Sequence, residues 1–131
     1  SLSAKEYKTN SKKFNEVDDT NVWQMEFSNG QVANCATSFS ASMNNLHLGF
    51  EKGFAKLHPA YTWRKVSGYT SKKQLTFPMI NQQAYHMDGI ANYLINKVPH
   101  NNVEGEEGLK DMIIIDKIFE SINKNSNTVL L

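Results

Sequence analysis

The chain has 131 residues, of which 40% are hydrophobic and 21% charged, and its formal net charge is +1. This length suits one domain with a hydrophobic core, so we expect a single domain over residues 1–131. The nearly balanced charge gives no general attraction to nucleic acid or to a membrane surface, and we expect neither partner. The single cysteine, Cys35, excludes a disulfide within the chain and favours a reducing, cytoplasmic compartment.

The first predicted strands form a hairpin. Residues 22–27 alternate between two faces, with Trp23, Met25 and Phe27 on the same one. Asn29-Gly30 follows, and this pair supplies the two positive-φ residues of a tight turn. The return strand is expected over residues 31–40.

Further antiparallel strands are predicted in the middle of the chain. Gly53 fits a left-handed position in the turn of a second hairpin. Ser67-Gly68 and residues 71–73 predict breaks between strands. The lysine-rich opening segment, residues 1–13, predicts a loose lead-in or the remnant of a loop instead. The predicted strands lie at residues 46–50, 54–58, 61–66 and 74–77.

The last third has the spacing of helices. Asn81 is predicted to cap a helix that runs to about Lys97. A second helix is expected to begin near residues 104–107, whose carboxylates favour the positive end of the helix dipole, and residues 128–131 predict an edge strand. Strands followed by helices predict an α+β fold: an open, mostly antiparallel sheet with helices packed on one face. The apolar positions expected to face the core are Ala84, Met87, Ile90, Ala91, Leu94, Ile95, Leu109, Met112, Ile113, Ile115, Ile118, Phe119 and Ile122.

Sequence motifs for catalysis are missing. There is no glycine-rich dinucleotide fingerprint and no phosphate loop, so we expect this chain alone to bind no cofactor. The four histidines are widely spaced, and we expect no metal site. Cys35 lies in a predicted strand and is interpreted as a small core residue rather than a nucleophile.

Three other clusters have both a functional and a structural interpretation. Glu106-Glu107 could be a pair of catalytic carboxylates, but complementing the helix dipole is favoured. Trp63-Arg64-Lys65, with the tyrosines of residues 61–69, could bind nucleic acid, but a half-exposed strand is favoured. His86 and Asp88 could serve a small enzyme, yet residues two apart on a helix point to different faces. No residue of this chain is therefore predicted to be catalytic.

Four segments, in order along residues 14–131, resemble one known domain. The most specific is Gly105–Asp111, which runs into an isoleucine-rich helix. The others are Trp23–Gln31, Gly49–Leu57 and Asn81-Gln82. Together they resemble the C-terminal domain of the glucose–fructose oxidoreductase family, also written Gfo/Idh/MocA, which includes inositol dehydrogenases. The Trp-Gln-Met strand makes the likeness nearest to glucose–fructose oxidoreductase.

The resemblance implies a larger enzyme. In that family an N-terminal Rossmann domain of the same parent chain holds NAD or NADP, and the sugar or polyol lies between the two domains. The open sheet face commonly joins subunits, so a homo-oligomer is implied. The family's catalytic lysine belongs to a Glu-Lys-Pro motif of the first domain. Here Glu51-Lys52 is followed by Gly53, so no catalytic residue can be carried over.

The resemblance also implies which residues face the substrate. The candidates are Asn44 and Asn45 at a strand opening, and Asn81, Gln82 and Tyr85 at a helix start. Their amide and phenol groups can donate and accept, which suits sugar hydroxyls. Tyr85 is similar in position to a substrate-side tyrosine of inositol dehydrogenases. The structural alternative makes Asn81 a helix cap and Tyr85 a core residue.

The expected function is therefore that of a domain, with catalysis belonging to the parent protein. The domain would shape the substrate cleft and the subunit interface of an NAD(P)-dependent sugar or polyol oxidoreductase. The alternative is a stand-alone sugar-binding or scaffold module with no catalysis.

Overall fold

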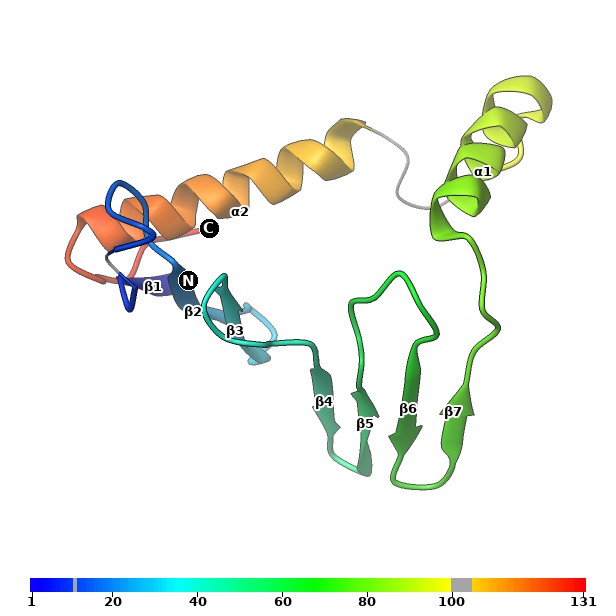
Figure 1. The fold of residues 1–131 in the computed structure, drawn as a ribbon, viewed down its shortest axis with the longest axis horizontal. Helices are drawn as coiled ribbons and strands as arrows, with labels where there is room; N and C mark the ends of the chain where they lie inside the picture. Colours follow the sequence, from blue (N-terminus) through cyan, green and yellow to red (C-terminus); the bar gives the residue numbers. More distant parts are fainter. Residues whose placement is uncertain (11, 100–104) are drawn as a thin grey trace. The chain divides into compact units, whose positions relative to one another are not determined.

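The structure is a computed structural model that describes residues 1–10, 12–99 and 105–131. These residues form seven strands and two helices, and every strand pairing is antiparallel, which confirms the α+β class. The chain divides into two compact units, Ser1–Met43 with Glu104–Leu131, and Asn44–Val103. Each unit has its own sheet and one helix (Figure 1). One of the four histidines, His100, and the first residue of the predicted second helix, Glu104, lie outside the described residues.

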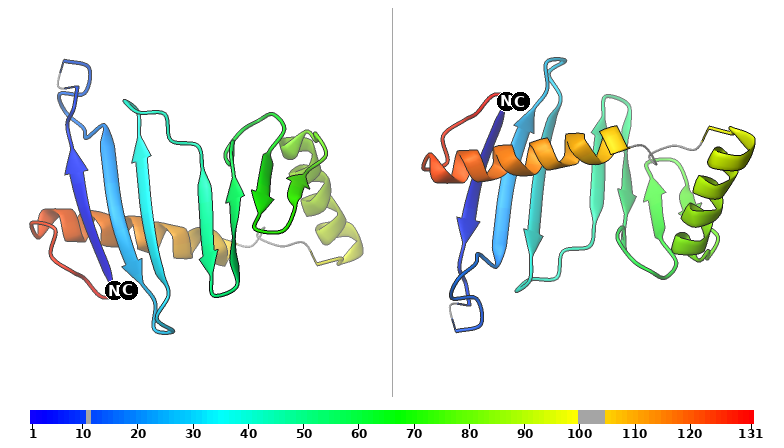
Figure 2. Two further views of the ribbon diagram at one scale, coloured as in Figure 1. Left: turned by 90° about the horizontal axis from the view of Figure 1, so that it is seen from below. Right: turned by 90° about the horizontal axis from the view of Figure 1, so that it is seen from above.

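The first unit contains a three-stranded sheet and the longer helix. The sheet has the order β1-β2-β3, and helix α2 packs against β1 (Figure 2). The prediction of a loose lead-in over residues 1–13 is wrong for β1. Its polar residues obscured a short alternation in which Leu2 and Ala4 face inward while Lys5 is exposed. The elements are β1 (Leu2–Tyr7), β2 (Thr20–Glu26), β3 (Val32–Ser38) and α2 (Gly105–Asn123).

The core of this unit lies between β1 and α2. Its buried hydrophobic residues are Leu2, Ala4, Ile118 and Val129, with Trp23, Met25, Ile114 and Ile122 packed against them. The shared face is therefore confirmed for Trp23 and Met25, whereas Phe27 lies beyond the end of β2 and is 44% exposed. The predicted edge strand at 128–131 is reduced to one bridge, in which Leu2 and Val129 exchange backbone hydrogen bonds of 2.9 and 2.8 Å.

Ser121 connects β1, α2 and the C-terminal segment. It is 0% exposed, and its Oγ accepts a hydrogen bond from the Ala4 amide at 2.9 Å. The same hydroxyl donates to the Asn127 carbonyl at 2.7 Å. Both backbone groups thereby have a hydrogen-bond partner at a position where water has little access. Buried polar groups generally require such partners.

The first hairpin turn needs only one residue of positive φ. Gly30 has φ +83°, and its amide donates to the Phe27 carbonyl at 3.0 Å. The predicted pair of positive-φ residues is wrong for Asn29, whose side chain instead accepts a hydrogen bond from the Gln31 amide. A type I turn followed by a left-handed glycine joins strands equally well.

Asp19 organises the loops beside this hairpin. Its carboxylate is buried and accepts hydrogen bonds from Thr9 Oγ1, the Asn10 amide and Ser40 Oγ at 2.8–2.9 Å. Burial alone would raise the pKa of Asp19, but these hydrogen bonds outweigh it and hold the pKa well below its usual value. The ionised carboxylate therefore ties the segment after β1 to the segment after β3.

The second unit contains a four-stranded sheet and the shorter helix. The strands follow the order β4-β5-β6-β7, and the second predicted hairpin is confirmed, with Gly53 at φ +150°. Helix α1 begins after its cap Asn81 and ends at the left-handed Lys97, as predicted. The elements are β4 (Leu46–Phe50), β5 (Gly53–Leu57), β6 (Ser67–Thr70), β7 (Gln74–Thr76) and α1 (Gln82–Asn96).

Strand β6 falls where the sequence predicted a break. The expected strand at 61–66 is wrong, because these residues belong to the loop between β5 and β6. Gly68 is a buried strand residue, and a Cβ built there would overlap the Lys56 carbonyl and approach Leu57 Cδ2 to 2.6 Å. Glycine is thus needed for close contact with β5, and not for a turn.

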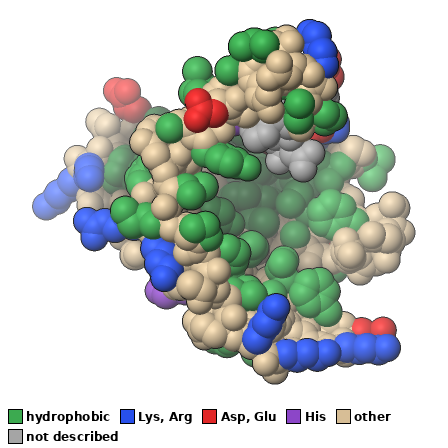
Figure 3. Space-filling view, turned by 90° about the vertical axis from the view of Figure 1, so that its right-hand side faces the viewer, with side chains coloured by type: hydrophobic (Ala, Val, Ile, Leu, Met, Phe, Trp, Pro, Cys, Tyr) green, Lys and Arg blue, Asp and Glu red, His purple; other side chains and the backbone are tan. Residues whose placement is uncertain are grey.

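Both helices carry more exposed apolar surface than predicted. Helix α1 has no buried residue, and Ile118 is the one buried hydrophobic residue of α2. The helical spacing correctly predicted apolar stripes, but spacing does not say what covers a stripe. Hydrophobic side chains, green in Figure 3, accordingly lie at the surface. The largest exposures on the two helices are those of Tyr85, Met87, Leu94, Ile95, Leu109 and Met112.

Glu120 links two lysines along α2 and gives a pH-dependent contribution to stability. Lys117 and Lys124 each donate to its carboxylate at 2.7 Å, and these hydrogen bonds lower the pKa of Glu120 from 4.5 to about 2. Because the folded-state pKa is depressed, this stabilisation is complete above the unfolded-state value and is lost as the pH falls toward about 2.

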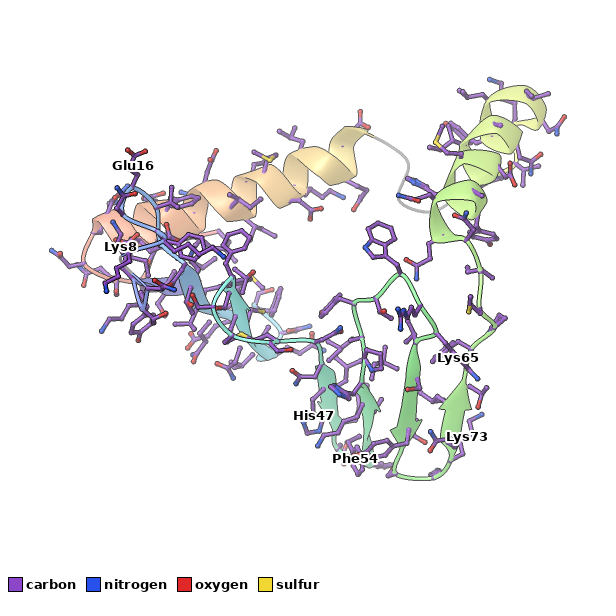
Figure 4. All side chains as sticks on the ribbon, in the orientation of Figure 1. Lys8, Glu16, His47, Phe54, Lys65 and Lys73 are labelled. Carbon is purple, nitrogen blue, oxygen red and sulfur yellow. The ribbon has the colours of Figure 1, made fainter. Side chains whose placement is uncertain are left out.

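We expect Glu120→Gln to lower the unfolding free energy at neutral pH and to have no effect once the pH falls below about 2. Urea unfolding at a series of pH values measures this difference. The exposed Glu16 (Figure 4) provides the control Glu16→Gln. An equal loss from Glu120→Gln at every pH would contradict the ion-pair explanation.

Candidate functional site

Asn44 anchors the loop between β5 and β6. Its side-chain Oδ1 accepts a hydrogen bond from the Tyr61 amide at 2.6 Å. Its carbonyl accepts from the Ala60 amide at 3.2 Å and from His58 Nδ1 at 3.0 Å. Asn44, which the resemblance predicts to face the substrate, thus also holds residues 58–66 in place.

The start of α1 holds the same loop from another side. Gln82 Nε2 donates to the Thr62 carbonyl at 3.0 Å. Asn81 Oδ1 accepts from the Ala84 amide at 3.1 Å, so its predicted role as helix cap is confirmed. The structure therefore brings Asn44 and Gln82 to adjacent loop residues, Tyr61 and Thr62.

The other two candidates are exposed side chains. Asn45 lies directly before β4, and Tyr85, in the first turn of α1, is 63% exposed. The interpretation of Tyr85 as a core residue is therefore wrong. Whether any of the five candidates faces substrate remains a prediction.

The loop of residues 58–66 was not predicted from the sequence. Tyr61 is 67% exposed and Trp63 is 75% exposed, although hydrogen bonds hold the Tyr61 amide and the Thr62 carbonyl. The cluster of aromatic and basic residues was noticed in the sequence, but a strand was expected there. The signal that could have identified a loop is the strand-forming pattern of residues 67–70, which was hidden by Gly68.

One face of the second sheet carries an aromatic row. The rings of His47 and Phe54 meet edge to face with centroids 5.9 Å apart, and Phe54 meets Tyr69 in the same way at 5.9 Å (Figure 4). Such pairs stabilise adjacent strands. This row fixes β4, β5 and β6 together, and thus supports both ends of the loop.

Metal ligands and the cysteine thiol are the reactive groups to consider first in the described residues. Within residues 1–10, 12–99 and 105–131, no group of three or more His, Cys, Asp or Glu side chains could hold a metal ion. Burial raises the pKa of the Cys35 thiol, which lowers the fraction present as the nucleophilic thiolate. The amide side chains around residues 58–66 can both donate and accept hydrogen bonds.

A solved protein structure has a fold similar to that of this chain. No protein-family model matches the chain. The chain is similar to the crystal structure of an aldose-aldose oxidoreductase from Caulobacter crescentus complexed with glycerol, with a TM-score of 0.83 and 24% sequence identity. The match covers 99% of this chain and 40% of that one. The chain thus has the fold of part of a sugar oxidoreductase, and spans less than half of that protein's length.

Neither α1 nor α2 combines the length and the hydrophobicity that a bilayer-spanning helix requires.

Proposed function

We propose that this chain is the substrate-side domain of an NAD(P)-dependent sugar or polyol oxidoreductase of the glucose–fructose oxidoreductase family. The observation that carries the proposal is the fold likeness over 99% of this chain to part of an aldose-aldose oxidoreductase. The sequence resemblance at Trp23–Gln31 and Gly105–Asp111 supports it independently.

In the proposed enzyme, the nicotinamide cofactor and the catalytic residues belong to a Rossmann domain of the same parent protein. Hydride would pass between the cofactor, NAD or NADP, and a carbon of the sugar or polyol. This domain contributes by positioning: amides at fixed places orient hydroxyl groups and reduce the entropy lost on reaching the reactive geometry. Asn44, Asn45, Asn81, Gln82 and Tyr85 are the residues proposed to face the substrate.

We also propose that the open sheet face joins subunits in a homo-oligomer. In the first unit, Trp23 and Met25 are used in the core, so the face available for contact carries Val22, Gln24 and Glu26. Sedimentation of the native protein over a range of concentrations tests this, and a strict monomer at the highest concentration would exclude it.

The function is tested with the native full-length protein. We expect formation of reduced nicotinamide when it is mixed with an aldose or inositol and NAD or NADP, measured by absorbance. Substitution of Gln82 by alanine should raise KM more than it lowers kcat, because Gln82 would contribute to binding. A native protein that binds sugar but no nicotinamide would instead be the stand-alone sugar-binding module.

A further inference from the structure

We infer that Trp63 and Tyr61 form a stacking surface for a pyranose ring, beside the amides of Asn44 and Gln82. The inference rests on the proposed function, since it names the part of a sugar that the domain would recognise. Its starting point is the exposure of two large aromatic side chains on one short loop, 75% for Trp63 and 67% for Tyr61. Exposed aromatic side chains of this size are common where proteins bind partners or ligands.

The loop presents these rings on a fixed backbone. Asn44 holds the Tyr61 amide, and Gln82 holds the Thr62 carbonyl. At the base of the loop, the His58 amide donates to the Ser67 carbonyl at 2.9 Å, and Ser67 Oγ donates to the His58 carbonyl at 2.8 Å. A ligand that stacks on such a loop loses less free energy to ordering the protein than one that binds a free segment.

Among the described residues, each of the two amides beside the rings makes one side-chain hydrogen bond and keeps its other polar atom for a ligand. The side-chain bond of Asn44 uses Oδ1, and the side-chain bond of Gln82 uses Nε2. The remaining donor, Asn44 Nδ2, and the remaining acceptor, Gln82 Oε1, match the two roles of a hydroxyl group. A pyranose has an apolar C–H face for the rings and hydroxyl groups at its edge for the amides.

Nucleic acid would use the same rings for base stacking but needs more positive charge. Single-strand binding combines aromatic platforms with a basic groove along the backbone. The loop carries Arg64 and Lys65, the second of which is labelled in Figure 4, but the chain's net charge is only +1. The small net charge therefore favours a neutral ligand over nucleic acid. Binding of an oligonucleotide to these rings is the competing outcome of the test.

The two tryptophans allow a direct experiment on this chain. Trp23 packs against the core of the first unit, whereas Trp63 is exposed, so the two indole N–H signals in an NMR spectrum report on separate places. Trp63→Phe identifies which signal is which. We expect glucose to shift the Trp63 signal and leave the Trp23 signal unchanged, while glycerol, a polyol with no ring, shifts neither.

Substitutions test whether the ring contributes to affinity. We expect Trp63→Ala to weaken glucose binding about tenfold or more, which corresponds to about 1.4 kcal/mol, and Trp63→Phe to retain most of it. Phe50→Ala is the matched control, because Phe50 is also an exposed aromatic residue of this unit, at 64%, but lies on β4. Equal glucose affinity in the native chain and Trp63→Ala, or a Trp63 signal moved by an oligonucleotide but not by glucose, would overturn the inference.

The inference and the proposed function can fail separately. If the full-length protein transfers hydride and Trp63→Ala leaves its KM for sugar unchanged, the stacking surface is wrong and the proposed function stands. If glucose shifts the Trp63 signal but the full-length protein shows no nicotinamide chemistry, the stacking surface stands and the proposed function is wrong.

Discussion

Replacement of Leu2 by alanine is expected to lower the unfolding free energy of the first unit by about 2–4 kcal/mol. Leu2 is 1% exposed and packs in the core between β1 and α2. Its backbone also exchanges two hydrogen bonds with Val129, so the neighbouring segments are held and cannot collapse fully into the space left by the side chain. The loss therefore includes a cavity as well as the transfer of apolar groups.

Urea unfolding followed by Trp23 fluorescence measures this effect, in a Trp63→Phe background that leaves one tryptophan. The control is Leu130→Ala, because Leu130 is the same residue type in the same unit and is 80% exposed. It should change stability by no more than about 0.5 kcal/mol. Similar losses from the two substitutions would show that the core does not lie where the structure places it.

Replacement of Gly68 by alanine is expected to destabilise the second sheet by about 1–3 kcal/mol, the usual cost of overpacking. The added Cβ would overlap the Lys56 carbonyl of β5, a backbone atom that cannot rotate away. Strands β5 and β6 would have to separate, and they carry the two ends of the loop that holds Tyr61 and Trp63. Both the sheet and the proposed stacking surface should therefore be affected.

Gly49→Ala provides a control for which we expect stability to rise rather than fall. A Cβ at Gly49, in the neighbouring strand β4, has no neighbour within 4 Å. Because alanine restricts the unfolded chain more than glycine does, a gain of about 0.5–1 kcal/mol is expected there. Hydrogen exchange of the amides in β5 and β6 measures both changes. Unaltered protection in Gly68→Ala would contradict the close contact between these strands.

The sequence alone was sufficient for features that depend on local interactions. The strand of Trp23 and Met25, the hairpin around Gly53 and the cap at Asn81 were predicted, because alternation, turn geometry and capping involve residues close together in the chain. The α+β class followed from the change of spacing after residue 78.

Individual residues of the candidate site could be predicted from the sequence, but not that these residues lie close together. Asn44, Gln82 and the aromatic residues of 61–69 were each noticed, yet they are far apart in the sequence. What joins them is the loop of residues 58–66, and that loop was hidden because Gly68 was interpreted as a turn residue. A glycine that permits close strand contact and one that permits a turn look the same in a single sequence.

Local pattern therefore predicted both helices and strands β2, β3, β4, β5 and β7, because alternation, turn geometry and capping act between residues close together in the chain. It did not predict β1 or β6. The tertiary structure decided which of the apolar faces are covered. Leu2 and Ala4 form a core in a segment that looked polar, because Ile118 and Val129 reach them from the other end of the chain. The stripe of α1 stays exposed, because burial depends on a partner surface that no helical period describes.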